Sequence, residues 1–337
     1  MPPPPKVSVL IPTYKYARYL PDAIESVLAQ DFGDFEVIIS DDASPDQSGD
    51  VIRHYAALDP RIKFQVLGKN IGMVPNWNWC LREAQGEYCK FVFGDDCLVS
   101  RQALGKMAAM LDAAPCAALA ASARLILDEE SRSVEVWDDF RQAGIYPGLD
   151  VIARCLWQDR NLVGEPSAVM FRRAAATRGF DPALRQVVDL EMWFHLLLAG
   201  DLAFDPEPLC GFRRHAGQQT VANRDSHVGP TESLMIADRY LGVLGNRAGL
   251  SPFALRYICY RCLYYSRKRA PRLPGILAME SALSARLPAG WRRFLWLLHR
   301  CTKPFSNLRR ALGRARERRT PPAAPQLQAG RLRWTPR

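Results

Sequence analysis

The chain of 337 residues, 48% of them hydrophobic, is long enough for one large domain with an appendage or for two domains. Its net charge of +10 is unevenly distributed, because residues 1–250 carry 25 Lys/Arg against 33 Asp/Glu and residues 251–337 carry 20 against 2. An acidic body is therefore joined to a strongly basic end, and no apolar run reaches the 18 residues expected of a membrane span.

The cysteines are nine in number and scattered, and we see no signal peptide before them. This favours reduced thiols in a cytosolic protein over a disulfide framework. Cys259 and Cys262 have the spacing of a metal or redox pair, but no second pair accompanies them. We therefore expect two thiols packed in a helix.

Strand and helix alternate along the first hundred residues. A proline-rich leader at 1–6 is expected to be disordered. Short β-branched or aromatic runs after it predict buried strands, and apolar residues at helical spacing predict helices between them. The expected strands are 7–11, 35–40, 62–67 and 88–93, and the expected helices are 17–30, 47–58 and 73–84. This alternation predicts an α/β fold with a mostly parallel sheet flanked by helices.

After residue 96 the pattern becomes less regular, and no internal repeat is visible. An acidic stretch at 128–148 is expected to be irregular. From residue 303 the chain is rich in arginine and then in Pro, Ala and Gln, so this tail is expected to lack a fixed structure. The expected helices are 101–112, 149–157, 187–199, 231–269 and 275–300, and the expected strands are 116–127, 166–171 and 208–213.

Two predicted strands end in a pair of adjacent carboxylates. Asp41-Asp42 closes the strand 35–40, and Asp95-Asp96 follows the strand 88–93. In open α/β sheets ligands bind at the carboxyl ends of strands, and paired carboxylates suit a divalent cation with its phosphates or the polar edge of a nucleotide. A solvated turn would explain one such pair, but two pairs in the same context favour a binding site.

The first strand is followed by Pro12–Tyr16, which lacks the glycines of a phosphate-binding loop. This removes the main support for a dinucleotide-binding dehydrogenase or a P-loop enzyme. A nucleotide must then be held by side-chain carboxylates and a metal ion.

Several motifs in the same order resemble the family-2 inverting glycosyltransferases of the GT-A fold, over about residues 6 to 220. They are Val7–Tyr14, Asn70–Gly72, Asn76–Asn78, Gly86–Asp96, Gly164–Ser167 and Arg213–His215, together with Asp41–Asp46. The resemblance implies a Rossmann-like GT-A domain at 7–225, with a nucleotide-sugar-binding half at 7–100 and an acceptor half at 101–225. The helical spacing and the charge of the residues after it predict a helical extension at 226–302 and a basic tail at 303–337.

The resemblance also implies roles for residues that grip the donor. Thr13 and Asp42 would contact the nucleobase and ribose of a nucleotide-sugar, with Asp41 beside them. Arg213 would hold the diphosphate or be a solvated charge at a strand end.

In the acidic motif of this family, Asp95 and Asp96 would meet the diphosphate, the second Asp binding the Mg²⁺ or Mn²⁺ ion that bridges it. His215 would lie near that metal or be a surface histidine. A cation held by carboxylates stabilises the negative charge that develops on the leaving diphosphate.

Asp189 aligns with the catalytic base of the family. Asp189 and Glu191 point roughly 200° apart on a helix, so only one of them can face the sugar, and Glu191 stays open as a substitute. Val188 replaces an acid that often precedes the base, so a raised pKa must come from burial. Trp193, one turn after Asp189, is expected to pack in the core or to stack on a sugar.

Two other positions depart from the family pattern: Lys15 stands where Asn is usual, and Ala43 where Gly is usual. The expected reaction is the inverting transfer of a sugar from a UDP-sugar to a hydroxyl of a glycan or lipid-linked acceptor, as in cell-surface polysaccharide synthesis. Two alternatives remain, a metal-dependent nucleotidyltransferase and a non-catalytic binder of sugar nucleotides.

The basic end interleaves aromatic, leucine and arginine residues in Trp291–Arg300, and more arginines follow it from Arg309. Such a segment favours peripheral contact with the anionic inner face of a cytoplasmic membrane, which suits a lipid-linked acceptor. A solvated arginine-rich tail is the alternative. Nucleic acid is not expected as a partner, because no recognised binding module accompanies the charge.

Overall fold

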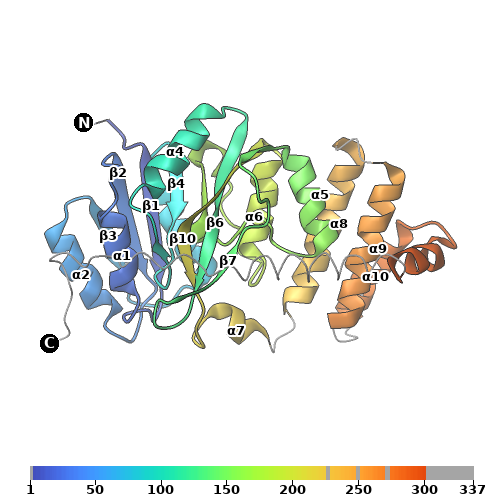
Figure 1. Cartoon of the computed structure of the whole chain (residues 1–337). Helices are drawn as coiled ribbons and strands as arrows, with labels where there is room; N and C mark the ends of the chain where they lie inside the picture. Colours follow the sequence, from blue (N-terminus) through green and yellow to red (C-terminus); the bar gives the residue numbers. More distant parts are fainter. Residues whose placement is uncertain (1–2, 225–227, 248–250, 270–273, 301–337) are drawn as a thin grey trace.

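The computed structural model describes residues 3–224, 228–247, 251–269 and 274–300, and Figure 1 shows their arrangement. A sheet of ten strands has the order β3-β2-β1-β4-β9-β6-β10-β5, with β7 paired to β6 and β8 to β10. The strands are β1 Val7–Thr13, β2 Phe35–Asp41, β3 Ile62–Val66, β4 Tyr88–Phe91, β5 Cys97–Leu98, β6 Ala117–Leu127, β7 Ser133–Trp137, β8 Gly144–Tyr146, β9 Val169–Arg172 and β10 Asp201–Arg213.

Helices connect these strands and continue after the last of them. The α-helices are α1 Leu20–Leu28, α2 Ser48–Leu58, α3 Met73–Glu83, α4 Ala103–Ala113, α5 Gly148–Gln158, α6 Val188–Leu197, α7 Gln219–Arg224, α8 Val228–Arg247, α9 Pro252–Arg269 and α10 Pro274–Ala285. Two short 3₁₀ helices, η1 Pro166–Ala168 and η2 Arg173–Ala176, flank β9. Residues 291–300 are also helical.

The first four strands confirm the predicted parallel sheet. β1 pairs in parallel with β2 and β4, and β2 pairs in parallel with β3. β1, β2 and β4 are buried along their whole length, as expected for strands covered on both faces, whereas β3 at the edge is partly exposed. This register places the last residue of β1, Thr13, opposite the last residue of β2, Asp41, at one edge of the sheet.

The second half of the sheet is mixed, and here several predicted boundaries are wrong. The expected strand 166–171 begins only at Val169, because Pro166 opens a 3₁₀ turn. The expected strand 208–213 is the end of β10, in which Pro208 lies at two register shifts against β6. Proline cannot donate a ladder hydrogen bond, so the irregularity hides the longer strand from its sequence pattern. The stretch 128–148 contains the short strands β7 and β8.

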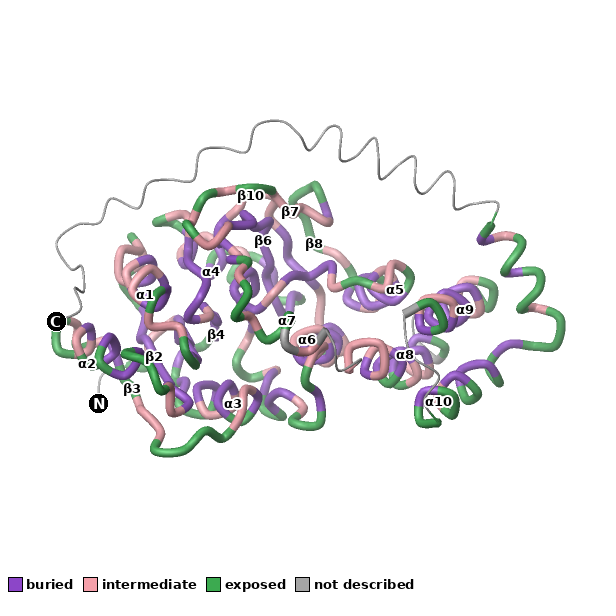
Figure 2. The backbone as a smooth tube through the Cα atoms, turned by 90° about the horizontal axis from the view of Figure 1, so that it is seen from below, coloured by how far each residue is buried: buried purple, intermediate pink, exposed green. Residues whose placement is uncertain are grey.

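Helices cover both faces of the sheet, which makes three layers. Apolar residues of α1, α2 and α4 form one core with one face, and residues of α3, α5 and α6 form a second core with the other. In Figure 2 the strands β2 and β4 lie between α1 and α3. All of the cysteines in the described ranges are free, and seven of the eight, including Cys259 and Cys262 in α9, are buried as expected.

The C-terminal helices pack onto the second core at the end of the molecule away from β3, as Figure 1 shows. The expected helix 231–269 is two helices, α8 and α9, and the expected helix 275–300 is α10 followed by the helix 291–300. The second break contains Pro288 and Gly290, whose φ of 82° a glycine adopts without strain. Among the described residues, no helix is long and apolar enough to cross a bilayer.

The two chain ends were predicted to be disordered, and most of the residues concerned lie outside the described ones. The tail at 303–337 and residues 1–2 of the leader belong to this part of the chain. Lys6, the last residue of the leader, is fixed by ion pairs with Glu87 and Asp112, whose nitrogen–oxygen distances are 2.8 and 2.7 Å.

Candidate active site

A large cleft lies at the carboxyl ends of β1, β2 and β4, where the sequence places its paired carboxylates. Its volume is about 1430 Å³. One wall comes from the segments after β1 and β2 and from the turn after β4, and the opposite wall from α5, α6, α8 and α9. Of the predicted site residues, the cleft lining contains Thr13, Asp42, Asp95, Asp189 and His215.

Thr13 ends β1 at the floor of the cleft. Its Oγ1 is buried and has no hydrogen-bond partner among the described residues. Gly94 passes so close that a Cβ at this position would lie 2.6 Å from that oxygen, so the turn before Asp95 requires glycine. An unpaired buried hydroxyl is costly, and at the edge of a cleft it is a ready contact for a polar ligand.

The carboxylates of Asp41 and Asp42 lie in different environments. Asp42 lines the cleft, where its two oxygens accept hydrogen bonds from the backbone N–H groups of Ile71, at 2.7 Å, and Gly72, at 3.0 Å. Asp41 is fully buried and accepts hydrogen bonds from the N–H and hydroxyl of Ser44. Burial raises the pKa of Asp41 above its usual value. Asp41 thus shapes the turn that presents Asp42.

Asp95 and His215 form a pair that faces the cleft. The Nε2 atom of His215 lies 3.0 Å from Oδ2 of Asp95, and Nδ1 of the ring accepts a hydrogen bond of 3.2 Å from the N–H of Gly217. A neutral ring held in this way carries its proton on Nε2 and donates it to Asp95. The rings of Tyr16 and Tyr19 pack against the imidazole, and burial, followed by the charges of Asp95 and Asp96, raises the pKa of Tyr16.

Asp96 lies behind this pair and does not belong to the described cleft lining. Its Oδ2 accepts a 2.5 Å hydrogen bond from the Ser167 hydroxyl, and its Oδ1 accepts one of 3.0 Å from the N–H of Arg213. Burial and the charge of Asp95 raise the pKa of Asp96 well above its usual range. Asp95 therefore faces the cleft, whereas the sequence predicts that Asp96 binds the metal.

The Arg213 side chain is also kept away from the cleft. Its guanidinium is buried and donates to the Asp95 carbonyl at 2.8 Å, to the Asp22 carboxylate at 3.0 Å and to the Ser131 hydroxyl at 2.5 Å. These bonds tie the end of β10 to the acidic turn. The neighbouring Arg214, by contrast, lines the cleft and lies over the ring of Trp137.

Lys90, which the sequence analysis does not single out, is fully buried in β4 beneath the acidic turn. It donates hydrogen bonds to the carbonyls of Ser167 and Phe91. Burial lowers the pKa of its ammonium group to about 8. Because Ser167 also donates to Asp96, this lysine holds the 3₁₀ turn η1 that positions the acidic turn.

Asp189 stands at the start of α6 on the opposite wall. One oxygen accepts a hydrogen bond of 2.9 Å from the Asn161 amide, and the other accepts one of 2.8 Å from the N–H of Leu190. Burial raises the pKa of Asp189 to about 7, as expected for a carboxylate that has no ion pair with a Lys or Arg of the described residues. A carboxylate with this pKa is suited to accept a proton near neutral pH.

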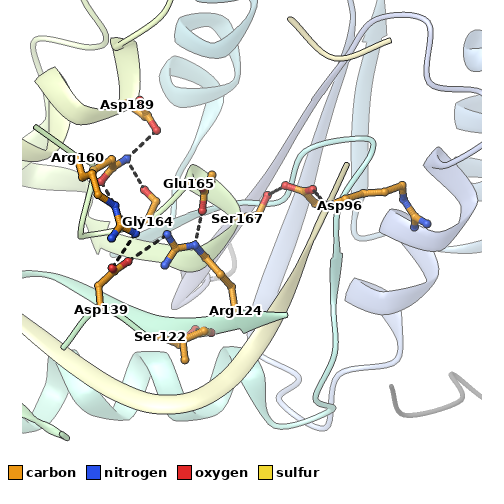
Figure 3. Close-up of polar contacts among 12 residues, drawn as sticks. Asp96, Ser122, Arg124, Asp139, Arg160, Gly164, Glu165, Ser167 and Asp189 are labelled. Atoms are coloured by element: carbon orange, nitrogen blue, oxygen red, sulfur yellow. Dashed lines mark hydrogen bonds and ion pairs between the residues drawn. The ribbon is translucent and has the colours of Figure 1, made fainter. Parts of the chain in front are cut away.

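A buried ionic network supports this wall, as Figure 3 shows. The guanidinium of Arg124 lies between the carboxylates of Glu165 and Asp139, and Asp139 also accepts a 3.0 Å ion pair from Arg160. Glu165 and Arg160 line the cleft, so the network fixes charged groups on both sides of Asn161. The side-chain amide of Asn161 donates hydrogen bonds both to the carbonyl of Gly164 and to the carboxylate of Asp189.

Glu191 points away from the cleft, as the helix geometry requires if Asp189 faces it. The Glu191 carboxylate is fully buried and pairs with Arg178 at 2.7 Å and Arg239 at 2.8 Å. Tyr240 also donates to it at 3.0 Å. Trp193 is buried among aromatic rings, and its indole N–H donates to the Gly164 carbonyl, so it packs in the core and does not stack on a ligand.

Within the described residues, no group of three or more His, Cys, Asp or Glu side chains is arranged to hold a metal ion. Asp95 nevertheless offers a carboxylate to the cleft, and Mg²⁺ or Mn²⁺ is often held by one or two carboxylates together with substrate phosphates. The donor set therefore fits a cation that arrives with a diphosphate. His215 can ligate such an ion through Nε2 only in the tautomer that carries the ring proton on Nδ1.

The sequence reasoning misses three groups that shape this site: Lys90, Asn161 and the network around Arg124. The motif Gly164–Ser167 points to the right segment but not to its partners. Asn70, Asn76 and Asn78, also part of the matched motifs, make hydrogen bonds to the backbone, at Asp42, Ser40 and Phe180 respectively.

The model of the family described as Glycosyl transferase family 2 matches residues 8–180, which is just over half of the chain. The chain belongs to this family. The match covers β1 to η2 and includes both acidic pairs and the Arg124–Glu165 network. The expected resemblance is thereby confirmed, and the protein is a glycosyltransferase.

Relatives of known sequence agree with this assignment. The Mycobacterium tuberculosis (strain CDC 1551 / Oshkosh) protein MT1568, of uncharacterised function, is 30% identical over 225 residues, 64% of this chain and 70% of the relative. A Campylobacter jejuni protein named GalNAc(5)-diNAcBac-PP-undecaprenol beta-1,3-glucosyltransferase is 41% identical over 98 residues, 28% of this chain and 31% of that protein. The chain also matches the Bacillus subtilis proteins TuaG and EpsJ, over 36% and 26% of their respective lengths.

Solved structures show that the fold is that of the GT-A glycosyltransferases. Staphylococcus aureus TarS 1–349, in complex with UDP-GlcNAc, matches with a TM-score of 0.65 at 20% identity, over 84% of this chain and 82% of that one. The mannosyltransferase PcManGT from Pyrobaculum calidifontis, in complex with GDP-Man and Mn²⁺, matches with a TM-score of 0.54 at 19% identity, over 87% and 83%.

Proposed function

We propose that this glycosyltransferase moves a sugar from a UDP-sugar to a hydroxyl of a glycan or lipid-linked acceptor, with inversion. The observation that carries the proposal is the joint presence of Asp42, Asp95 and Asp189 in one cleft, with the pKa of Asp189 raised to about 7 by its burial. The first two lie on the nucleotide side and the third on the opposite wall, so a donor and an acceptor can meet between them.

The nucleoside would lie against the ends of β1 and β2. Asp42 is held rigidly by Ile71 and Gly72, which leaves its cleft-facing edge fixed for a base or ribose. The unpaired Thr13 hydroxyl offers a further polar contact. The likeness of the fold to TarS, whose structure contains UDP-GlcNAc, supports uridine as the nucleoside.

The diphosphate would lie over the turn at Asp95, where Mg²⁺ or Mn²⁺ would be held by this carboxylate. When bound, the cation would neutralise charge on the leaving diphosphate. Asp96, Arg213 and Lys90 would act from beneath by fixing the turn, and His215 would orient Asp95 through their 3.0 Å contact.

The chemical step would be a single displacement. The acceptor oxygen would form a bond to the anomeric carbon while the bond from that carbon to the diphosphate oxygen breaks, and the hydroxyl proton would pass to Asp189. Asn161 and the Leu190 N–H would hold Asp189 for this transfer. A positioned base of matched pKa contributes about 10²- to 10⁴-fold to such a rate.

The acceptor would enter along the wall formed by α5, α8 and α9, which is partly apolar through Leu156, Leu234 and Cys262. A Campylobacter jejuni relative is named for an undecaprenol-linked substrate, which supports a lipid-linked acceptor here. We accordingly propose a cytoplasmic protein working at the inner face of the membrane, and a division of the chain into a transferase domain at 7–225 and a helical extension from 226.

The test is release of nucleoside diphosphate from a panel of nucleotide-sugars, with Mg²⁺ or Mn²⁺ and membrane lipid extract as a source of acceptor. Asp95→Ala should abolish release, and a chelator should do so reversibly. Asp34→Asn, an exposed carboxylate outside the cleft, is the matched control and should keep full activity.

The two alternatives give different results in the same assay. A nucleotidyltransferase would release pyrophosphate from a nucleoside triphosphate. A non-catalytic binder would bind the nucleotide-sugar in a calorimeter without turnover. Absence of both binding and turnover for every donor would overturn the proposal.

A further inference from the structure

A continuous row of aromatic rings crosses the surface of the C-terminal helices. Trp157 of α5 contacts Tyr257 of α9 at a centroid distance of 4.5 Å, and Tyr257 stacks on Phe253 at 6.4 Å. Phe253 contacts Trp291 at 6.1 Å, and Trp291 contacts Phe294 at 5.6 Å. The row therefore joins α5 to the helix 291–300, although 133 residues separate Trp157 from Trp291 in the sequence.

Tyr257 is buried in the core, but other rings of the row reach the surface. Trp157, Phe253 and Phe294 are 37%, 41% and 51% exposed, and Trp296 and Leu297 on the same last helix are 44% and 50% exposed. In Figure 2 this helix, beyond α9 and α10, alternates buried and exposed residues. Several large apolar side chains exposed on neighbouring helices in this way favour a contact with a partner or with a membrane.

Arginines surround the patch. Arg256 lies over Trp291 at 4.5 Å and Arg300 over Trp296 at 5.2 Å. Arg261 lies over Trp157 at 5.7 Å but is itself buried. Residues 251–300 contain ten Lys/Arg and one acidic residue, Glu280. Glu280 is buried and bonded to Ser266 and Arg267, so it does not offset the charge at the surface.

The positive charge of this face indicates which kind of partner it can bind. A second copy of this chain would bring the same basic face against itself. Residues 301–337 carry ten Lys/Arg and one Glu, so they are repelled as well. An anionic bilayer is complementary to both features, because arginines meet its headgroups while Trp, Phe and Leu enter the boundary with the acyl chains.

We propose that the aromatic–arginine face, defined by Trp157, Phe253, Trp291, Phe294, Trp296 and Leu297 with their arginines, docks the protein on an anionic phospholipid bilayer. This docking rests on the membrane location proposed above and deepens it, and it is tested apart from the transfer reaction.

The face lies beside the cleft. Leu156, Asp159 and Arg160, which flank Trp157 at the end of α5, line the cleft, as do Cys262 and Tyr265 of α9. Docking would therefore bring the α5–α9 wall of the cleft close to the lipid headgroups. An acceptor held in the membrane would reach the site without leaving the bilayer.

The experiment is co-sedimentation of the full chain with vesicles of phosphatidylcholine alone or mixed with phosphatidylglycerol. We expect binding only to the anionic vesicles, weakened by salt. The variant Phe294→Ser/Trp296→Ser/Leu297→Ser should lower the partition coefficient by at least about tenfold, since the apolar contact is lost while every arginine is kept.

The matched control is Leu58→Ser/Val134→Ser/Ile145→Ser, which removes three residues that are 49%, 53% and 51% exposed in the α/β part of the molecule. It should bind as the parent does. Circular dichroism and release of nucleoside diphosphate in detergent establish that both variants are folded, so a failure of docking is distinct from a failure of the proposed reaction.

Three results would overturn the inference. The first is that the parent does not bind anionic vesicles. The second is that the triple variant on the last helix binds them as well as the parent does, which would mean that charge alone causes the binding. The third is a dimer, seen by light scattering, that the same variant abolishes, which would make the face an interface between copies.

Discussion

Asp189 is held by Asn161 and Leu190 at the edge of the cleft, with its pKa raised to about 7 by burial. A general base works only when deprotonated, so the rate should rise with pH up to about 7 and level off above it. We expect Asp189→Asn to lower kcat by about 10²- to 10⁴-fold. The measurement is kcat for sugar transfer across the pH range.

The asparagine keeps the size of the side chain, so donor binding should be unchanged in calorimetry. A second variant, Asn161→Ala, removes one hydrogen bond to the carboxylate form and should move the inflection to higher pH. An unchanged pH profile in Asp189→Asn, with activity retained, would show that another group accepts the proton.

Ala43 has a φ of 56°, the left-handed region that glycine adopts freely and that costs other residues energy. The sequence analysis expects Gly at this position from the family pattern, and the backbone shows why. We expect Ala43→Gly to raise the free energy of unfolding by about 1 kcal/mol. Urea unfolding followed by circular dichroism measures this.

The matched control is Ala109→Gly on the exposed face of α4, where the same replacement should lower the free energy of unfolding by about 1 kcal/mol. A loss of stability at both positions would contradict the left-handed backbone at Ala43. Lys15, which stands where Asn is usual in the family, also has a left-handed φ, of 62°, and lines the cleft.

The sequence motifs locate the segments that form the site, but they do not give the orientation of each side chain. Asp95 and Asp96 are adjacent, and their direction is decided by Ser167 and Arg213, which are 71 and 117 residues from Asp96. The environment that buries Asp189 comes equally from distant segments. No local pattern records these contacts, so the roles of Asp96 and Arg213 could not be read from the motif.

The helix α6 places two acidic residues in two different environments. Asp189 meets the cleft, whereas Glu191 is fully buried against Arg178, Arg239 and Tyr240. Removing one partner of a buried ion pair leaves the other charges uncompensated. We expect Glu191→Ala to lower the free energy of unfolding by about 3 kcal/mol and to leave kcat of the folded protein within about twofold.

Thermal unfolding and kcat of the same preparation measure the two effects. Glu135→Ala, on the exposed part of β7, should change stability by less than about 0.5 kcal/mol. Loss of kcat with unchanged stability in Glu191→Ala would restore Glu191 as the catalytic base.

The elements themselves were largely predictable in the first half of the chain. Val7–Thr13 and Phe35–Asp41 are mostly apolar, because both of their faces are buried along the whole strand. Prediction failed at two prolines. Pro166 opens a 3₁₀ turn, so β9 starts later than expected. At Pro208 the pairing with β6 maintains β10 despite the missing donor. Tertiary contacts, not local propensity, set those boundaries.

For the whole molecule, the helical extension is part of the same core as the α/β body. Buried residues of α8, α9 and α10 belong to one hydrophobic cluster with α5, α6 and the strands. Glu232 of α8 also accepts hydrogen bonds from the backbone N–H groups of Arg185, Gln186 and Val187, just before α6. The change in charge after residue 250 therefore marks a change of surface and not a separate hydrophobic core.

A shared core predicts that the molecule unfolds as one unit. Leu283 of α10 is fully buried in that core, and Leu283→Ala should lower the free energy of unfolding by about 3 kcal/mol. The melting temperature of the whole chain should fall in a single transition, seen alike by circular dichroism and by the loss of donor binding. Leu277→Ala, on an exposed position of the same helix, should leave it unchanged. Two transitions, with only the first moved by Leu283→Ala, would mean that the extension folds by itself and that the cleft stands without it.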